Sequence, residues 1–225
     1  MPLILAIETG SNICSVALAR DGELLALRES EGRDHASRVA VFAQELLAEC
    51  GVELSQLDAV ALGSGPGSYT GLRIGSSFAK GLCYGLSIPL IAVGSLELLS
   101  AQVVESGVDL KGAILMPMID ARRMEVYMAA FNGVGEMLGQ VEAKVIEEGS
   151  LAEYSDKRLI IFGSGAEKCL PLLPWAEMME VRASARGIIK LAERRLKNNM
   201  VEDVAYFEPL YLKEFQVIPS KKRLF

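Results

Sequence analysis

Two acidic residues at the ends of apolar segments are the first candidates for chemistry in this chain. Glu8 ends the segment "LILAIE" and Asp120 ends "AILMPMID", and a short turn follows each of them. A carboxylate at such a turn can position a magnesium ion and an attacking water, and a Gly-Ser-Gly turn, present at residues 63–65 and 163–165, can hold phosphates through its backbone. The pattern predicts a nucleotide cleft with these candidates: Glu8, Thr9, Ser11, Asp120, Arg122, Gly163 and Gly165.

Both acidic turns depart from the pattern of a working phosphate site. Glu8 stands where such sites usually carry Asp, so its carboxylate would reach about one bond length further out. The second turn, residues 120–123, has no glycine and carries Arg122 and Arg123 where a phosphate loop needs bare backbone. Arginine can itself bind phosphate. We therefore describe the cleft as degenerate and keep an ATPase or a small-molecule kinase as an alternative function.

The Gly-rich segment "GSGPGSYTG", residues 63–71, lies between an apolar run and a predicted helix. It does not fit the pattern G-x-G-x-x-G, because Ser68 and Thr70 occupy the positions of the last glycine. The following "GSSFAKG" carries its lysine before the last glycine, unlike a Walker A loop. The segment therefore favours a tight strand-to-helix turn over a phosphate loop.

Hydrolase and metal chemistry find little support in the sequence. No G-x-S-x-G motif is present, and the one histidine, His35, precedes an amphipathic helix and is expected at the surface. One histidine cannot supply a two-histidine metal site. Glu8 and Asp120 could act as a glycosidase pair, but nothing else suggests that chemistry. The four cysteines, Cys14, Cys50, Cys83 and Cys169, include no C-x-x-C pair. We therefore expect them to be small buried side chains in a reducing compartment and not metal ligands.

The composition sets limits on size, location and partners. The 225 residues are 51% hydrophobic, enough for one large domain or two small ones with a full core. The net charge is −6, no segment fits a membrane span and no basic leader opens the chain, so we expect a cytoplasmic protein without membrane contact. Residues 1–102 hold 6 basic and 11 acidic side chains, and residues 103–225 hold 17 and 18. Any RNA-facing charge would therefore lie in the second half.

Two basic features of the second half support a further alternative. One is the tail at residues 221–223, Lys-Lys-Arg, and the other is a series of cations spaced four apart: Arg182, Arg186, Lys190 and Arg194. The helix dipole gives cations near a helix C-terminus a purely structural explanation. A tRNA-binding module that uses residues 186–197 and the tail is the second alternative function.

A framework of strands and helices must bring these residues together. The first half is expected to begin with a strand at 3–9 and a hairpin with an Asp21-Gly22 type I′ turn. Helices and strands then alternate: a helix from Asp34 to Gly51, a strand at 58–65, a helix from Thr70, a strand at 88–94 and a helix capped by Ser95. In the second half we expect strands at 113–120, 125–131 and 158–165, an Asn132-Gly133 turn and a helix capped by Ser184. Such an order predicts sheets that are partly parallel and covered by helices.

The two halves repeat one pattern. "LAIETGSNICSVALARDGEL" compares with "PMIDARRMEVYMAAFNGVGEM", and "AVALGSGPG" compares with "LIIFGSGAE". The shared order favours a duplicated α/β unit. Two such units around a cleft resemble the actin-like (ribonuclease H-like, ASKHA) fold of ATPases and sugar kinases. We therefore expect a two-lobed α/β fold, with an N-terminal lobe at 1–102 and a C-terminal lobe at 103–225.

Four segments resemble the TsaB (YeaZ) family in the same order: "ILAIETGS", "GSGPGSYTGLRIG", "IDARRMEVY" and "EPLYLKEF". The resemblance implies a non-catalytic subunit of the machinery that forms threonylcarbamoyl on the adenosine beside the anticodon of ANN-decoding tRNAs. It implies TsaD, the transferase, and TsaE as partners, self-association as a homodimer when the protein is alone, and contact with tRNA only through the complex. It also implies no cofactor of its own, with ATP or ADP and a metal on the partner subunits.

The resemblance further implies that helices of the N-terminal lobe contact TsaD. Gly71, Gly75 and Ala79 recur every four residues and predict a smooth helical stripe, which faces either the protein's own sheet or a partner's helix. On the second interpretation, Gly75→Leu would weaken pairing and leave the monomer folded. The candidate interface residues are Val39, Phe42, Leu46, Gly67, Tyr69, Gly71, Arg73, Gly75, Phe78 and Ala79.

Overall fold

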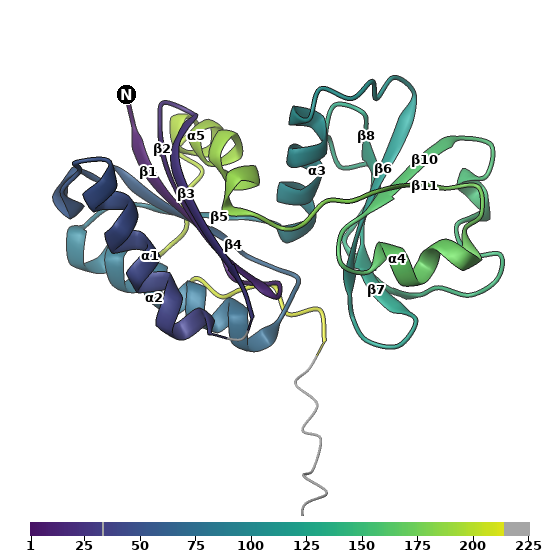
Figure 1. Cartoon of the computed structure of the whole chain (residues 1–225), viewed down its shortest axis with the longest axis horizontal. Coiled ribbons are helices and arrows are strands. Elements are labelled where there is room, and N and C mark those ends of the chain that lie inside the picture. The colour runs from purple at the N-terminus through teal and green to yellow at the C-terminus, as the bar shows by residue number, and fades with distance from the viewer. Residues whose placement is uncertain (33, 214–225) are drawn as a thin grey trace, which may run out of the picture.

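The computed structural model describes residues 1–32 and 34–213, and its first lobe is built on a five-stranded sheet (Figure 1). The strand order is β3-β2-β1-β4-β5, with β1 (Leu3–Glu8), β2 (Ile13–Arg20), β3 (Glu23–Glu31), β4 (Ala59–Gly63) and β5 (Leu90–Val93). β1, β2 and β3 are antiparallel neighbours, whereas β1, β4 and β5 run parallel. Asp21 and Gly22 join β2 to β3 with φ values of 55° and 77°, which confirms the predicted type I′ turn.

Helices cover both faces of this sheet because alternate side chains of each strand point to opposite sides. Leu5 and Ile7 pack with α1 (His35–Glu49) and α2 (Tyr69–Leu86). Ile4 and Ala6 belong to the core that includes α3 (Ser95–Glu105), the 3-10 helix η4 (Ala185–Ile188) and α5 (Ile189–Lys197). The carboxyl ends of the parallel strands β1 and β4 meet at one edge of the sheet, where ligands of open α/β folds usually bind.

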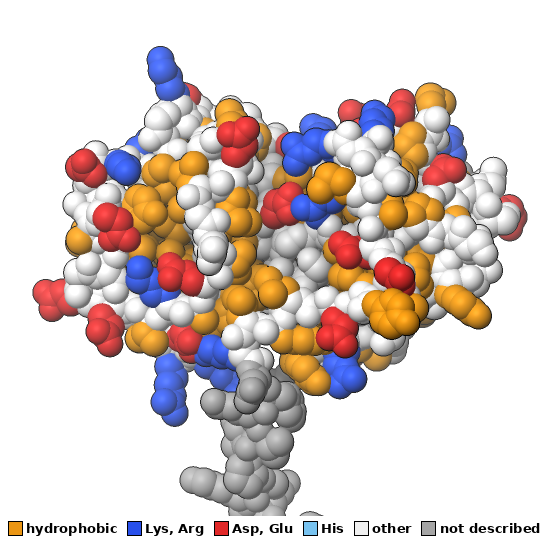
Figure 2. All heavy atoms as spheres, turned by 180° about the vertical axis from the view of Figure 1, so that it is seen from behind, with side chains coloured by type: hydrophobic (Ala, Val, Ile, Leu, Met, Phe, Trp, Pro, Cys, Tyr) orange, Lys and Arg blue, Asp and Glu red, His pale blue; other side chains and the backbone are white. Residues whose placement is uncertain are grey.

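The second lobe is built on a six-stranded sheet with the order β11-β10-β6-β7-β9, and β8 pairs with β6 outside this path. Its strands are β6 (Ala113–Asp120), β7 (Glu125–Met128), β8 (Phe131–Asn132), β9 (Glu142–Val145), β10 (Arg158–Phe162) and β11 (Glu177–Met179). Between them lie α4 (Ala166–Cys169) and the 3-10 helices η2 (Ala152–Tyr154) and η3 (Leu170–Leu172), and η1 (Leu54–Gln56) belongs to the first lobe. A view from behind shows the two lobes with a hollow along their junction (Figure 2).

The predicted duplication is confirmed strand by strand. β6 is antiparallel to β7 and parallel to β10, as β1 is antiparallel to β2 and parallel to β4. The sheet order β9-β7-β6-β10-β11 therefore repeats β3-β2-β1-β4-β5. The second copy is reduced, because η2 stands in the place of α1 and the short α4 stands in the place of α2.

The chain does not divide into two lobes at residue 102, as its sequence had predicted. After β11 it returns to the first lobe, where η4 contacts β1, β2 and β4, and α5 contacts β1 and β5. Glu202 then bridges to Leu90 at the edge of the first sheet, and Phe207 is buried in the core under α2. The second lobe is therefore an inserted unit around residues 113–179, and the predicted boundary at 103–225 is wrong. The basic tail at residues 221–223 lies outside the described residues.

Three local predictions need correction. Asp34 and Ser95 were expected to cap helices, but the Asp34 side chain makes no capping hydrogen bond, and Gly94 rather than Ser95 is the cap of α3. The predicted strand at 125–131 is interrupted between β7 and β8. Ser184 does cap its helix, since its Oγ accepts a hydrogen bond of 3.2 Å from the Arg186 N–H, although the helix begins with a 3-10 turn.

Cys14, Cys83 and Cys169 are buried as predicted, whereas Cys50 is half-buried. Burial raises the pKa of the Cys14 and Cys83 thiols to about 11, so neither is a reactive thiolate near neutral pH. Within residues 1–32 and 34–213, no helix has the length and apolar character needed to cross a bilayer.

Candidate functional site

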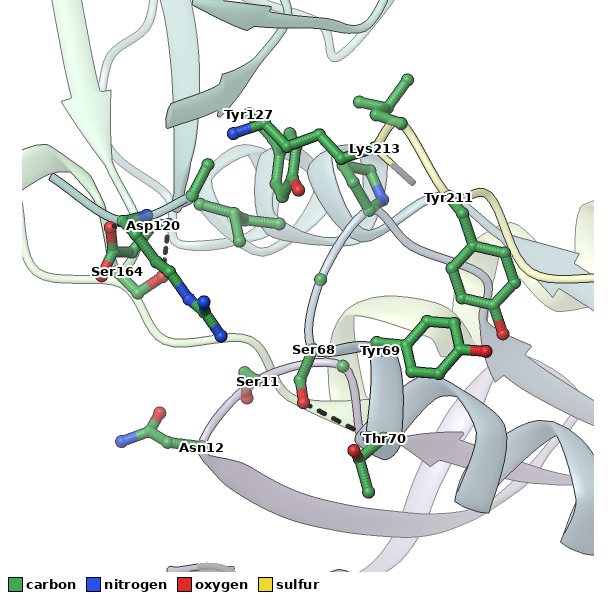
Figure 3. Close-up of a pocket in the computed structure, with 18 of the residues that line it drawn as sticks. Ser11, Asn12, Ser68, Tyr69, Thr70, Asp120, Tyr127, Ser164, Tyr211 and Lys213 are labelled. Atoms are coloured by element: carbon green, nitrogen blue, oxygen red, sulfur yellow. Dashed lines mark hydrogen bonds between the residues drawn. The ribbon is translucent and has the colours of Figure 1, made fainter. Parts of the chain in front are cut away.

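A cleft of about 1990 Å³ lies between the lobes, at the edge where β1, β4 and β6 end. Ser11 and Asn12 from the β1–β2 turn and Ser68 to Thr70 from the start of α2 form one wall, and Asp120, Tyr127 and Ser164 face them from the second lobe (Figure 3). Tyr211 and Lys213 complete the rim (Figure 3). Of the predicted cleft residues, the fold brings only three to this lining: Ser11, Asp120 and Arg122.

Glu8 does not reach the cleft. Its side chain is fully buried, with Oε1 accepting a hydrogen bond of 2.5 Å from the Gly10 N–H, and Oε2 has no hydrogen-bond partner among the described residues. The carboxylate lies against Gly63, where a Cβ atom would overlap with Oε2. Burial raises the pKa of Glu8 from its ordinary value of 4.5 to about 7, and the Gly10 hydrogen bond opposes part of that rise. The expectation of a carboxylate that extends outward is therefore wrong.

The turn after Glu8 is held by contacts within the chain. The buried Thr9 hydroxyl donates a hydrogen bond of 2.8 Å to the Gly71 carbonyl, and Ser11 Oγ accepts one of 3.0 Å from the Ile13 N–H. His35 Nε2 lies 2.9 Å from the Ser11 carbonyl oxygen. His35 was predicted to lie at the surface, and this prediction is wrong. The side chain is buried, because its ring folds back over this turn.

Asp120 lines the cleft, but a cation of the same lobe neutralises it. Its carboxylate forms an ion pair with Lys168, and its Oδ1 accepts a hydrogen bond of 2.9 Å from the Arg122 N–H. Lys168 Nζ also donates a hydrogen bond of 2.7 Å to the Glu125 carbonyl, which fixes it beside the turn. Lys168 was not among the predicted residues, because its position in the sequence gives no sign of this partner.

The remaining cleft candidates, Arg122, Gly163 and Gly165, stand where the backbone conformation or close packing is unusual. Arg122 and Arg123 have φ values of 75° and 50°, a region that usually needs glycine, and both line the cleft. Gly163 has a φ of 95° and packs on the Met118 carbonyl, and a Cβ on Gly165 would come 2.7 Å from Val126. Neither glycine lines the cleft, so neither offers its backbone to a ligand there.

The segment "GSGPGSYTG" is a turn whose backbone is bonded to its own chain, as predicted. The N–H groups of Ser64 and Ser68 donate to the carbonyls of Val93 and Gly10 at 2.8 and 2.7 Å. The Gly65 carbonyl accepts from the Ser95 N–H at 2.8 Å. Gly65 has a φ of 98°, and the Leu210 carbonyl lies 2.8 Å from where its Cβ would stand. These bonds favour a structural role for the loop over phosphate binding.

The C-terminal segment at residues 200–213 closes one end of the cleft. Lys213 pairs with Glu125 of β7 and lies 5.8 Å from the centre of the Tyr127 ring. The Tyr211 and Tyr69 rings are 5.0 Å apart. The sequence signal for this contact was the aromatic cluster beside Pro209. Its partners could not be assigned, because they lie more than eighty residues away in sequence.

The structure separates the interface candidates into buried and accessible residues. Val39, Phe42 and Leu46 are buried in the core of the first lobe, which corrects their assignment as partner-facing residues. Gly71, Gly75 and Ala79 are also buried, and the two glycines pack directly on Thr9. The stripe therefore faces the protein's own sheet, and the prediction that Gly75→Leu would leave the monomer folded is wrong. Of the remaining interface candidates, Arg73 is exposed. The other three are half-buried: Gly67, Tyr69 and Phe78.

The cleft presents hydroxyl groups and cations; of its two predicted acids, Glu8 is buried away from it and Asp120 is paired with Lys168. Among residues 1–32 and 34–213, no group of three or more His, Cys, Asp or Glu side chains is placed to hold a metal ion. What the arrangement offers chemically is a recess with a largely apolar lining, a few hydroxyl groups, and a rim that carries the cations of Arg122, Arg123 and Lys213.

Two duplicated mixed sheets around a central cleft define the actin-like (ASKHA) class, and the predicted fold class is confirmed. The inorganic polyphosphate/ATP-glucomannokinase from Arthrobacter sp. strain KM shares this fold at 11% identity, with a TM-score of 0.51 over 88% of this chain and 100% of that chain. Residues 29–153 match the family model described as TsaD: tRNA N6-adenosine threonylcarbamoyltransferase.

YeaZ from Pseudomonas aeruginosa is much more similar, with 26% identity and a TM-score of 0.78 over 94% of this chain and 100% of that chain. The tRNA threonylcarbamoyladenosine biosynthesis protein TsaB of Escherichia coli (strain K12) is 40% identical over 130 residues, which is 57% of this chain and 54% of the relative. The chain belongs to the TsaB (YeaZ) family. These alignments span about half the length of the curated relatives.

Proposed function

We propose that this protein is a non-catalytic subunit needed to form threonylcarbamoyl on the adenosine beside the anticodon of ANN-decoding tRNAs. It acts in the cytoplasm as an activator and scaffold for the TsaD transferase, together with TsaE. ATP or ADP and the metal of the reaction are held by those partners. The observation that carries the non-catalytic part is the state of the two cleft acids: Glu8 is buried under Gly63, and Asp120 is paired with Lys168.

The single histidine of the chain gives further support. A solved relative from Pseudomonas aeruginosa is described by its similarity to peptidase YEAZ. General-base catalysis of peptide hydrolysis commonly uses a histidine next to a nucleophile. His35 lines the cleft, but its ring is largely buried and its Nε2 lies against the Ser11 carbonyl oxygen, so this nitrogen faces a backbone carbonyl and not a nucleophile.

The surface for the TsaD partner is the outer face of α2, formed by Ser77, Gly81, Tyr84 and Gly85. All four are exposed, and a Cβ on Gly81 or Gly85 would meet no atom within 4 Å. Two helices can approach closely at glycine positions, and an exposed tyrosine supplies contact area at little entropic cost. Tyr84 is 84% exposed, which is unusual for a large aromatic side chain without a partner. The same face would support the homodimer when the protein is alone.

Reconstitution of the modification reaction tests the function. With the threonylcarbamoyl-adenylate synthase, TsaD and TsaE present, we expect threonylcarbamoyl incorporation into tRNA to depend on this protein. The double variant Glu8→Gln, Asp120→Asn should support incorporation at near the wild-type rate, because neither carboxylate takes part in the chemistry. Equal incorporation without the protein, combined with tight Mg-ATP binding by the protein itself, would instead support the kinase or ATPase alternative.

Gly81→Leu tests the proposed partner face. The monomer should keep or raise its melting temperature, since leucine is favoured over glycine in a helix by roughly 0.8 kcal/mol and the site is open. Pairing with TsaD should weaken about tenfold or more, because the added side chain prevents close approach. Calorimetric titration measures the affinity, and Ala152→Leu on the exposed η2 of the second lobe is the matched control. Unchanged affinity in a folded Gly81→Leu protein would exclude this face.

A further inference from the structure

Four cations form one exposed face of the last helical segment, which we call the α5 face: Arg186, Lys190, Arg194 and Lys197. They recur at intervals of four, four and three residues, so they project from one side of η4 and α5. Ile188, Ile189 and Ala192 of the opposite side are buried against the first sheet. The α5 face therefore presents a row of positive charge about 17 Å long.

Ion pairs within the chain account for only part of this charge. The side chains of Arg186 and Arg194 make no hydrogen bond or ion pair with any described residue. Lys197 pairs with Glu193 at 2.7 Å, and Lys190 lies 3.8 Å from Glu105, near the limit of an ion pair. By contrast, Arg195 points inward on the same helix and bonds to the Ala92 carbonyl and Glu97.

The helix dipole does not explain the row either. It favours cations only in the last turn of a helix and disfavours them in the first turn. Arg194 and Lys197 are in the last turn of α5, but Lys190 is its second residue and Arg186 precedes it in η4. Arg186 and Lys190 are thus placed where the helix itself gains nothing from positive charge.

We propose that the α5 face binds the phosphate backbone of an RNA. A row of exposed cations, two of them without a partner among the described residues, suits a polyanion, whose phosphates repeat along its length. The remainder of the chain is acidic, since the net charge is −6 with these four cations included, so contact with RNA needs a local basic surface of this kind. The proposal rests on the proposed function only for the identity of the RNA, which would be the tRNA undergoing modification.

The double variant Arg186→Ala, Arg194→Ala tests the proposal, because it removes the two cations that have no partner among the described residues and leaves the folded contacts of α5 in place. Binding of fluorescently labelled tRNA is followed by anisotropy between 50 and 300 mM KCl, for the full-length protein alone and for its complex with the partner subunits. We expect about tenfold weaker binding at low salt and a salt-dependence slope smaller by about 2. The matched control is Lys111→Ala, Lys157→Ala, two exposed cations of the second lobe, which should leave both values unchanged.

Unchanged affinity and slope in the α5 variant would overturn the proposal. Normal tRNA binding with impaired assembly of the subunits would also overturn it, and would assign the face to an acidic protein partner. The test separates this proposal from the proposed function. If incorporation depends on the protein while the slope stays constant, only the RNA contact fails. If incorporation does not depend on the protein while the slope falls, only the proposed function fails.

Discussion

Glu8→Gln should stabilise the protein by about 3 kcal/mol at pH 8, because it removes the cost of an ionised carboxylate without hydration. The pKa of Glu8 is raised from 4.5 to about 7 in the folded protein. A raised carboxyl pKa means that the folded state binds the proton more tightly than the unfolded state does. The stability contributed by the protonated group is therefore fully present below pH 4.5 and is lost as the pH rises through 7.

Urea unfolding at several pH values measures this effect. The difference in unfolding free energy between Glu8→Gln and the wild type should grow by about 2 kcal/mol between pH 5.5 and pH 8. Glu23→Gln changes an exposed carboxylate and is the control, with no comparable pH dependence expected. A constant difference between Glu8→Gln and the wild type across this range would show that the carboxylate is not desolvated in solution.

Gly71→Ala and Gly81→Ala should have opposite effects on stability, although both replace a glycine of α2. At Gly71 the new Cβ would overlap with the Thr9 carbonyl oxygen, a backbone atom that can move only with β1. We expect a loss of more than ~3 kcal/mol, beyond the usual range for overpacking. At Gly81 the Cβ would enter open space, so the helix should gain about 1 kcal/mol.

Thermal unfolding of the two variants at equal protein concentration provides the comparison. Gly85→Ala is a second open position and should behave like Gly81→Ala. A Gly71→Ala protein that unfolds at the wild-type temperature would mean that α2 is not packed against Thr9. The stripe of Gly71, Gly75 and Ala79 would then be available to a partner after all.

Three of the seven predicted cleft residues do line the cleft, and the reason is the duplication. Because β1 and β6 are equivalent strands, Ser11, Asp120 and Arg122 lie at or just after strand ends that meet at one cleft. Lys168 and Lys213 were not predicted, since each finds its acidic partner on another element. The direction of the Glu8 carboxylate could not be predicted from the sequence either, because it depends on the space left by Gly63 on the neighbouring strand.

The sequence by itself determined the order of strands and helices, the Asp21-Gly22 turn, the duplicated unit and the turn at residues 63–71. These features follow from alternation, helical periodicity and the backbone freedom of glycine, which act between residues close in the chain.

Only the tertiary structure decided which side of α2 is buried and to which lobe residues 183–213 belong. The positions 71, 75 and 79 and the positions 77, 81 and 85 are both rows of small residues with the same spacing. Thr9 packs on the first row and leaves the second exposed. Likewise, local patterns could not show that residues 183–213 return to the first lobe. Such contacts join segments that are distant in sequence, and the packing of the whole chain selects them.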